Sequence, residues 1–263
     1  MERQYVAIDL HLNRSVVVTE NEAGEKVGVT RIDNEPLTLA EALREAGEAP
    51  EVAIEATYGW YWAVDTLQEL GATVHLVNPS GLNWEGRRVK NDYRDCCDLL
   101  DRMRLGKLPE AWIAPHAVRE LRELVRYRAR LVMLRTGLKA QLKAVLAKHG
   151  LRPPVKDLWG VVGPAWLDKL DLPRAYTTRI ESIRDLVEVY DREIDMLERE
   201  IHRELKDHPG YKAIQAIPGV GRTIAAIMVA EIGDISRFST PQALCSWAGL
   251  TPKHHESDTK VRR

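Results

Sequence analysis

The stretch Tyr5-Val6-Ala7-Ile8-Asp9 is a short apolar run that ends on a carboxylate, and it opens a series of strand signals. Two runs rich in β-branched residues follow, at residues 15–19 and 26–32. Between these two runs, Asn21-Glu22-Ala23-Gly24 has the composition of a turn. The pattern therefore predicts three strands that form an antiparallel meander.

Helix and strand signals alternate after this meander. The pattern predicts a helix over 37–46, a strand over 51–55, a helix over 60–70 that Gly71 closes, and a strand over 73–77 that Asn78-Pro79 stops. Three strands followed by alternating helix and strand is the order of elements in a ribonuclease-H-like mixed sheet. We therefore expect an α/β domain of this kind over residues 1–110.

From Pro115 onward the pattern changes to long helices. Apolar residues recur at helical spacing from Val118 to Val145, up to a break at Gly150. A second apolar series, with steps of three and four residues, makes a heptad-like seam: Ile180, Ile183, Val187, Tyr190, Ile194, Leu197, Ile201 and Leu205. We expect a coiled-coil region over residues 111–208. The seam leaves open whether two helices of one chain or two chains pair through it.

Residues 209–263 are predicted to form a small helical C-terminal domain. The segment Ile214-Gln-Ala-Ile-Pro-Gly219-Val-Gly221 runs into an apolar helix over 223–232. An apolar-Pro-Gly-apolar-Gly turn between two helices resembles the helix-hairpin-helix module, whose exposed backbone N–H groups can hold a phosphate. The alternative is a tight turn in which Gly219 and Gly221 only allow close packing.

The composition indicates a globular protein. The chain has 263 residues, of which 44% are hydrophobic, enough for about two domains, and its net charge is 38 − 39 = −1. Its apolar runs are far shorter than the roughly 20 residues that cross a bilayer. Its first residues lack the layout of a signal peptide, and its three cysteines suit a reducing compartment. We therefore expect a cytoplasmic protein without a membrane partner.

Charge is distributed unevenly along the chain. Nine basic residues stand against two acidic ones between Arg119 and Lys148, whereas acids dominate between Glu181 and Glu204. We expect the basic helix, together with Gly219 and Gly221, to contact a nucleic-acid backbone, and a solvated face is the alternative. The predicted basic contacts are Arg119, Arg122, Arg126, Arg128, Arg135, Lys139 and Lys143.

Four acidic residues are predicted to converge. Asp9 ends the first strand and Glu55 the fourth, and these strands are neighbours in a mixed sheet of this order. Asp92 and Asp95 lie three residues apart where a helix begins, so they share one face. Converging carboxylates repel one another, and Mg²⁺ or Mn²⁺ relieves that conflict.

Each acid also has an ordinary alternative when it is considered singly. Asp9 could be a hydrogen-bond acceptor at a strand end, and Glu55 a surface charge. Asp92 could be an N-cap, with Asp95 at the favourable end of the helix dipole. The metal-site interpretation therefore depends on all four acids occurring together.

Seven short motifs then occur in a characteristic order. They are Tyr-Val-Ala-Ile-Asp9-Leu-His, Ile-Glu55-Ala-Thr-Tyr-Gly-Trp, Val-Asn78-Pro, Lys-Asn-Asp92-Tyr-Arg-Asp95, Ile-Pro-Gly-Val-Gly221, Glu-Ile-Gly-Asp234-Ile-Ser-Arg-Phe and Gly-Leu-Thr-Pro252. In this combination the chain resembles, over essentially its whole length, the DEDD insertion-sequence transposases. These are relatives of the Piv pilin-gene invertase and include bridge-RNA-guided recombinases.

The resemblance implies a RuvC-like domain that holds Mg²⁺ or Mn²⁺ with Asp9, Glu55, Asp92 and Asp95. A coiled coil would join it to a transposase domain in which Ser257 is the nucleophile. The implied function is metal-dependent DNA strand cleavage and exchange by a mobile-element recombinase. The implied partners are DNA, a guide RNA and further copies of the chain, as a dimer or tetramer, in the nucleoid of a bacterium or archaeon.

Family members continue beyond this serine, whereas the sequence stops at Arg263. We therefore expect a shortened C-terminal domain with Ser257 exposed and away from the four acids. Two other functions stay open: a junction-resolving nuclease that uses the same acids with water as nucleophile, and an inactive fragment that only binds nucleic acid. An actin-like sugar kinase fits poorly, because it requires glycine after its first aspartate, where this chain has Leu10-His11-Leu12.

Overall fold

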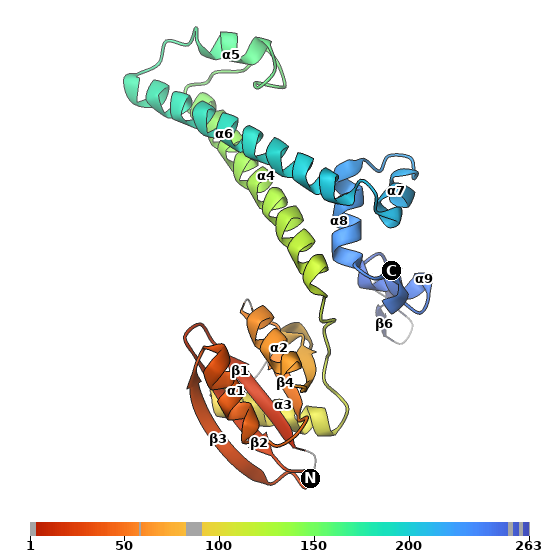
Figure 1. Ribbon diagram of the computed structural model, residues 1–263. Helices are drawn as coiled ribbons and strands as arrows, with labels where there is room; N and C mark the ends of the chain where they lie inside the picture. Colours follow the sequence, from red (N-terminus) through yellow and green to blue (C-terminus); the bar gives the residue numbers. More distant parts are fainter. Residues whose placement is uncertain (1–3, 58, 83–90, 252–254, 258–259, 263) are drawn as a thin grey trace. The chain divides into compact units, whose positions relative to one another are not determined.

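The computed structural model describes residues 4–57, 59–82, 91–251, 255–257 and 260–262, and for the last two stretches it describes the backbone alone (Figure 1). The chain divides into two compact units, residues 1–113 and 114–263, which we call unit 1 and unit 2. The predicted division into three domains stays a prediction.

In the described part of unit 1, five strands form one mixed sheet in the order β3-β2-β1-β4-β5. The strands are β1 (Tyr5–Leu10), β2 (Arg14–Glu20), β3 (Lys26–Asp33), β4 (Glu51–Glu55) and β5 (Thr73–Val77). β2 pairs antiparallel with both β1 and β3, whereas β4 pairs parallel with both β1 and β5. The predicted meander and mixed sheet are therefore confirmed, and β1 and β4 are neighbours.

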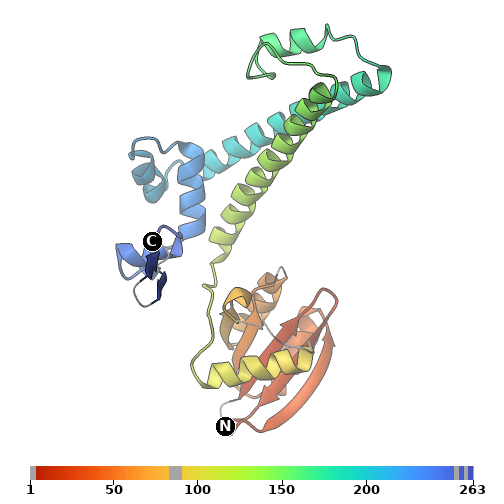
Figure 2. The ribbon, with the colours of Figure 1, turned by 180° about the vertical axis from the view of Figure 1, so that it is seen from behind.

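Helices cover both faces of this sheet. α1 (Pro36–Arg44) and α2 (Trp60–Glu69) pack on the face that buries Val6 and Ile8, and α3 (Asp92–Arg104) packs on the face that buries Ala7. Figure 2 shows α3, in yellow, lying across the sheet. Because side chains alternate along a strand, burial on both faces explains why the middle of β1 is apolar at every position. The 3₁₀ helix η1 (Pro79–Gly81) follows β5.

Two long helices dominate unit 2. α4 (His116–Lys148) and α6 (Arg174–Leu205) pack along each other, and the seam residues of α6 face α4. Leu131 of α4, for example, shares a buried cluster with Ile194 and Leu197. The long helices therefore pair within one chain. The connector between them contains the short helix α5 (Val162–Leu167).

Two shorter helices of unit 2 pack against one end of this helix pair. α7 (Pro209–Gln215) and α8 (Arg222–Ile232) share a core with α4 and α6, in which Tyr211 and Ala226 lie beside Leu121 and Ile201. They are followed by η2 (Ile235–Arg237), α9 (Pro241–Trp247), and the antiparallel strands β6 (His255–Ser257) and β7 (Lys260–Arg262), which the sequence pattern did not predict. Within the described ranges, no helix is both long and apolar enough to cross a bilayer.

Candidate metal site and nucleic-acid surfaces

Asp9 and Glu55 extend from the same face of the sheet. Ala7 of β1 pairs in register with Ala53 of β4, and both alanines are buried with residues of α3. Two residues further along, each strand returns to the same face, so Asp9 and Glu55 also project toward the α3 side. The metal-site hypothesis requires this arrangement, since carboxylates on opposite faces of a sheet could not share a cation.

α3 brings two more acids to this face. Asn91 precedes the helix, and its side-chain Oδ1 accepts a hydrogen bond from the Tyr93 N–H at 3.0 Å. The N-cap is therefore Asn91, and the alternative interpretation of Asp92 as the cap is wrong. Asp92 is the first helical residue and is partly exposed, whereas Asp95 is buried. Both lie where the helix dipole stabilises negative charge.

Asp9, His11 and Asp92 form a compact group of potential metal ligands. One ligand atom from each residue lies within 4.8 Å of the other two. Nε2 of His11 lies 3.3 Å from Oδ2 of Asp9 and 3.6 Å from Oδ1 of Asp92. In the part of the chain that the structure describes, Glu55 and Asp95 lie outside this close group. The structure thus brings two of the four predicted acids together and adds His11, which the sequence analysis did not assign to the site.

Strand periodicity does not by itself assign His11 to this group. His11 follows Asp9 by two residues, but β1 ends at Leu10, so the alternation of side chains along a strand does not extend to His11. Asn34 then holds the turn that follows β1, because its Nδ2 donates to the carbonyl oxygen of His11 at 2.6 Å. The Oδ1 of Asn34 accepts a hydrogen bond from the Ser15 hydroxyl, also at 2.6 Å. The backbone of His11 is therefore anchored beside Asp9.

Cys96 shows how closely α3 packs on the acidic end of β1. Its side chain is fully buried, and the thiol donates to the carbonyl oxygen of Val16 at 3.6 Å. Burial raises the pKa of the Cys96 thiol, and the nearby negative charges of Asp9 and Asp95 raise it further. Cys96 is therefore a neutral thiol that forms an apolar wall beside the acids.

The basic residues at the start of α4 make contacts inside unit 2. Arg119 is buried, and Arg122 donates to the backbone carbonyl oxygens of Ala230 and Glu231 at 2.8 and 2.9 Å. Arg126 donates to the two carboxylate oxygens of Glu231 at 2.8 and 2.7 Å. These contacts hold α4 against the end of α8, where the helix dipole concentrates negative charge.

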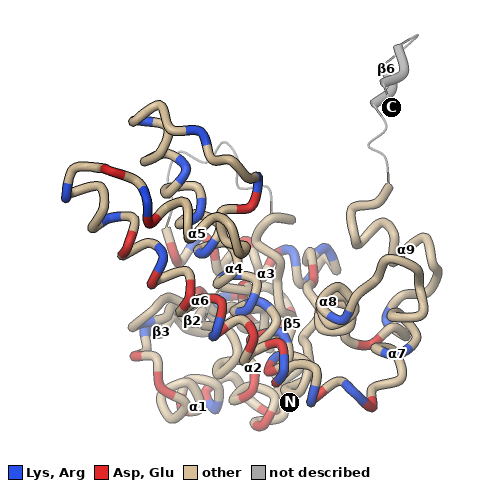
Figure 3. The backbone as a smooth tube through the Cα atoms, turned by 90° about the horizontal axis from the view of Figure 1, so that it is seen from above, with Lys and Arg blue, Asp and Glu red and all other residues tan. Residues whose placement is uncertain are grey.

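Two further arginines of α4 form ion pairs with α6. Arg128 pairs with Glu198, and Arg135 pairs with Asp191. Figure 3 shows basic and acidic residues interspersed along the helices of unit 2. Ion pairs between α4 and α6 thus explain part of the charge pattern, in which residues 119–148 are mainly basic and residues 181–204 mainly acidic. This gives Arg128 and Arg135 a structural role that the sequence analysis did not consider.

Other cations of α4 are more accessible to a ligand. Arg130 and Lys143 are exposed. Nζ of Lys139 lies 4.9 Å from the centre of the Trp159 ring, a cation–π distance. Arg130 and Lys143 are therefore better placed than Arg128 or Arg135 to contact a phosphate backbone. The nucleic-acid role of the basic helix stays a prediction.

The turn between α7 and α8 uses its two glycines differently. Gly219 has a φ of +85°, in the left-handed region that disfavours other residues. Gly221 is the N-cap of α8 with a φ of −80°, which any residue can adopt. A Cβ added at either position would meet no heavy atom within 4 Å. The left-handed φ of Gly219 agrees with the tight-turn part of the alternative interpretation, whereas close packing is not observed at either glycine. Phosphate binding by this turn stays a prediction.

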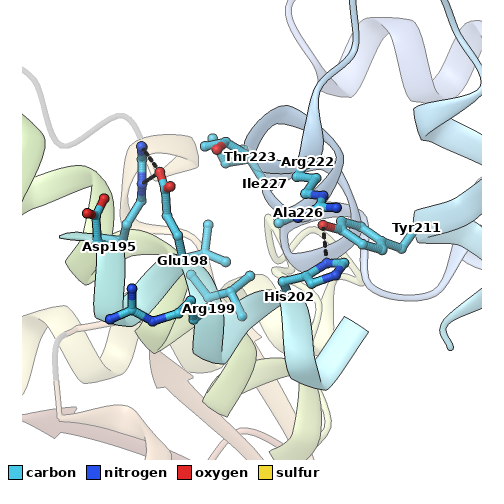
Figure 4. Close-up of a pocket in the computed structure, with 12 residues that line it drawn as sticks. Asp195, Glu198, Arg199, His202, Tyr211, Arg222, Thr223, Ala226 and Ile227 are labelled. Atoms are coloured by element: carbon cyan, nitrogen blue, oxygen red, sulfur yellow. Dashed lines mark hydrogen bonds and ion pairs between the residues drawn. The ribbon is translucent and has the colours of Figure 1, made fainter. Parts of the chain in front are cut away.

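A pocket of about 240 Å³ opens beside the start of α8 (Figure 4). Its lining combines apolar side chains such as Val125 and Ile201 with His202, whose Nδ1 lies 3.3 Å from the Tyr211 hydroxyl. Burial raises the pKa of Tyr211, and the positive charge of Arg222 partly opposes this. This pocket has no local signal in the sequence, because its residues come from four separate helices, α4, α6, α7 and α8.

Ser257 lies in β6, and its side chain is outside the described residues. Its predicted exposure and its predicted separation from the four acids therefore stay predictions.

The fold and the acidic group define a class of protein. A mixed five-stranded sheet, with acids at the ends of adjacent parallel strands and at the start of the covering helix, fits a DEDD nuclease-like domain. A family model for DEDD transposases of the IS110 type, described as "Transposase", matches residues 6–150. A second model, described as "Transposase IS116/IS110/IS902 family", matches residues 211–263. The chain belongs to the IS110 family of transposases.

Individual relatives agree with this assignment. A protein of Pseudomonas aeruginosa named "Probable family 20 transposase" is 27% identical over 80% of this chain and 64% of its own length. The transposase for insertion sequence element IS1111A of Coxiella burnetii is 25% identical over 80% of this chain and 58% of its own. The pilin gene-inverting protein of Moraxella bovis is 36% identical over 19% of this chain and 16% of its own. The chain therefore spans less than two thirds of the length of these relatives.

Proposed function

We propose that this chain acts on DNA as a transposase or recombinase, using a divalent cation held by Asp9, Glu55, Asp92 and Asp95. The observation that carries the proposal is the group formed by Asp9 and Asp92 on the α3 side of the sheet, whose carboxylate oxygens lie within 4.8 Å of each other. Membership of a transposase family supports DNA as the substrate. Mg²⁺ or Mn²⁺ is the expected ion, because hard cations prefer carboxylate oxygens.

The residues present fit such a cation. Asp9 and Asp92 repel each other unless a positive charge lies between them. When bound, the cation would supply Lewis-acid stabilisation of the charge that develops at a phosphodiester. The chain holds the carboxylates in place, since β1 is paired on both sides and α3 is capped by Asn91. Support of this kind is what an active site needs to keep its geometry.

A strand-cleavage assay tests the proposal. Asp9→Asn and Asp92→Asn each keep the side-chain size and remove the charge. Each should lower Mg²⁺-dependent cleavage of duplex or branched DNA by roughly a hundredfold or more. Glu41→Gln is the matched control, because Glu41 is an exposed acid on α1, which packs on the other face of the sheet. Cleavage by Asp9→Asn at the unmodified rate would contradict the metal site.

Cation binding can be measured without catalysis. A cation at 100 times its Kd should raise the free energy of unfolding by about 2.7 kcal/mol. Asp9→Asn and Asp92→Asn should lose this gain, and Glu41→Gln should retain it. If the cation stabilised the parent and the three variants equally, it would bind at another site.

The nucleophile distinguishes a recombinase from a hydrolytic nuclease. We propose that Ser257 attacks the phosphorus. Its Oγ–P bond forms as the bond to the leaving sugar oxygen breaks, and the hydroxyl proton passes to a base or to solvent. The family resemblance and the family match over residues 211–263 support this role. A covalent protein–DNA adduct that Ser257→Ala cannot form is the expected result. Free 5′-phosphate ends without an adduct would favour a nuclease that uses water.

A guide RNA and further copies of the chain are proposed as partners. The exposed cations Arg130 and Lys143, together with the turn at Gly219 and Gly221, support a nucleic-acid surface. Exposed apolar side chains on the long helices support assembly: Tyr127, Met133, Leu134, Leu186, Val189 and Met196. Sequencing of co-purified nucleic acid would identify a guide, and light scattering after size-exclusion chromatography would distinguish a dimer or tetramer from a monomer.

A further inference from the structure

We infer that His11 is a protein ligand of the bound cation, through Nε2, beside the carboxylates of Asp9 and Asp92. The inference rests on the proposed metal site and deepens it. It changes the expected donor set from oxygen alone to nitrogen and oxygen, and it adds a residue that the four-acid hypothesis does not contain.

The distances between the three donors match a shared ion. Donors bound to one divalent ion at about 2.1 Å, and adjacent in its coordination sphere, lie roughly 3 Å from each other. Nε2 of His11 is 3.3 Å from Asp9 and 3.6 Å from Asp92. The third distance, between the carboxylate oxygens of Asp9 and Asp92, is within 4.8 Å. The three donors are therefore near enough to bind one cation once the carboxylates move toward each other.

The same distances fit poorly with hydrogen bonding as the reason for the arrangement. An N–H···O hydrogen bond usually joins its heavy atoms at about 2.7–3.2 Å, and both Nε2 contacts are longer. In addition, Nε2 carries at most one hydrogen, so it can donate to only one of the two carboxylates that lie near it. A cation that both carboxylates and the imidazole bind would satisfy all three groups.

His11 is both fixed and accessible. Asn34 anchors its backbone through the hydrogen bond to its carbonyl oxygen, so the imidazole starts from a defined position. The side chain is 49% exposed, compared with 14% for Asp9, so a hydrated ion can reach Nε2 from solvent. A ligand that is held in place and open to solvent suits an ion that must also contact substrate.

The donor set predicts metal preference. Imidazole is a ligand of transition metals, whereas Mg²⁺ binds oxygen almost exclusively. Mn²⁺ should therefore bind this chain more tightly than Mg²⁺, and the difference should depend on His11. His11→Gln should weaken the binding of Mn²⁺ by about tenfold or more, and it should weaken the binding of Mg²⁺ less.

Pulsed electron paramagnetic resonance of the full chain with Mn²⁺ tests the inference directly. A ¹⁴N coupling from a coordinated imidazole is expected, and it should disappear in His11→Gln. The control is His116→Gln, which removes an exposed histidine in unit 2 and should keep the coupling. A coupling that survives in His11→Gln, or the absence of a ¹⁴N coupling in the Mn²⁺-bound parent, would overturn the inference.

Two further comparisons make the result specific. His11→Asp replaces nitrogen by oxygen, so it should lose the coupling yet bind Mg²⁺ more tightly than His11→Gln does. Equal Mg²⁺ affinity of these two variants would count against ligation at this position. If Asp9→Asn and Asp92→Asn abolished Mn²⁺ binding but the parent showed no nitrogen coupling, only the role of His11 would be overturned. Mn²⁺ binding that neither aspartate variant changes would overturn the metal site itself.

Discussion

Arg126 of α4 and Glu231 of α8 form a two-bond ion pair, in which Nε and Nη2 donate to different carboxylate oxygens at 2.8 and 2.7 Å. The hydrogen bond from Arg126 is the main cause that lowers the pKa of Glu231, and burial opposes it. The positive charge of Arg122 lowers the pKa further. This contact joins the first turns of α4 to the last turn of α8.

The Arg126–Glu231 contact should make stability depend on pH. The pKa of Glu231 is lower in the folded chain than its ordinary value of 4.5, so the unfolded state holds the proton more tightly. The stabilisation is therefore complete above pH 4.5 and is lost as the pH falls toward the folded pKa. Glu231→Gln should lower the free energy of unfolding by about 1 kcal/mol at neutral pH. Urea denaturation at neutral pH and well below pH 4.5 measures whether the gap between parent and variant closes. If the free energies of unfolding of parent and variant differed equally at both pH values, the loss of stability in Glu231→Gln would come from packing.

Substitution of a paired cation of α4 should change the stability of the chain, whereas substitution of an exposed cation should change DNA binding. Arg135→Gln breaks the contact with Asp191 and should lower the free energy of unfolding by about 1 kcal/mol. Lys143→Gln, at an exposed position, should leave stability unchanged. If Lys143 contacts a duplex phosphate, its variant should flatten the salt dependence of DNA affinity by up to about 0.9 in log–log slope. Denaturation curves and binding titrations over a range of salt measure both effects. An unchanged slope would indicate a solvated face.

The two glycines of the α7–α8 turn should respond differently to alanine. Gly219→Ala forces a residue with a Cβ into the left-handed region and should cost about 1–2 kcal/mol. Gly221→Ala has an ordinary φ and open space around it, so the free energy of unfolding should change by less than about 0.5 kcal/mol. Under the phosphate-binding hypothesis, Gly221→Ala should nevertheless weaken nucleic-acid affinity. Thermal denaturation and a binding titration on the same preparations compare the two. Unchanged affinity of a stable Gly221→Ala variant would argue against phosphate binding at this turn.

A second pair of glycines tests the packing of unit 2. Gly137 lies inside α4, exposed and with no atom within 4 Å of an added Cβ, so Gly137→Ala should stabilise the chain by about 1 kcal/mol through helix propensity. At Gly163 an added Cβ would lie 2.1 Å from the carbonyl oxygen of Leu158, so Gly163→Ala should destabilise the chain by about 1–3 kcal/mol. Calorimetry of both variants checks the two signs. If Gly137→Ala instead lowered the stability, the absence of a side chain at Gly137 would be required for assembly of the chain with further copies.

Much of unit 1 could be predicted from the sequence because its signals are local. The predicted strand over 15–19 is observed as Arg14–Glu20, and the strand over 51–55 is observed as Glu51–Glu55. Short apolar runs between turn residues specify such strands, and the order of signals is enough to place β1 beside β4. That placement is the basis on which the sequence predicts that Asp9 and Glu55 converge, whereas the face of the sheet from which they project is known only from the structure.

The details of the candidate site could not be predicted in the same way. His11 joins Asp9 and Asp92 through the course of a short turn that Asn34 holds, and Asn34 is 23 residues away in sequence. Similarly, the contacts of Arg128 and Arg135 depend on which face of α4 meets α6. Helical periodicity shows that a basic face exists, but it does not show whether acids of another helix neutralise part of it.

The sequence by itself determined the order of strands and helices, the apolar seam of α6 and the positions of the acids along the chain, because periodicity and turn composition act over a few neighbouring residues. Only the tertiary structure decided that Asn91 rather than Asp92 caps α3, that His11 lies between two carboxylates, and that Arg126 holds the end of α8. Each of these depends on side-chain distances of a few ångströms between atoms that packing and strand register bring together, and such distances have no local pattern in sequence.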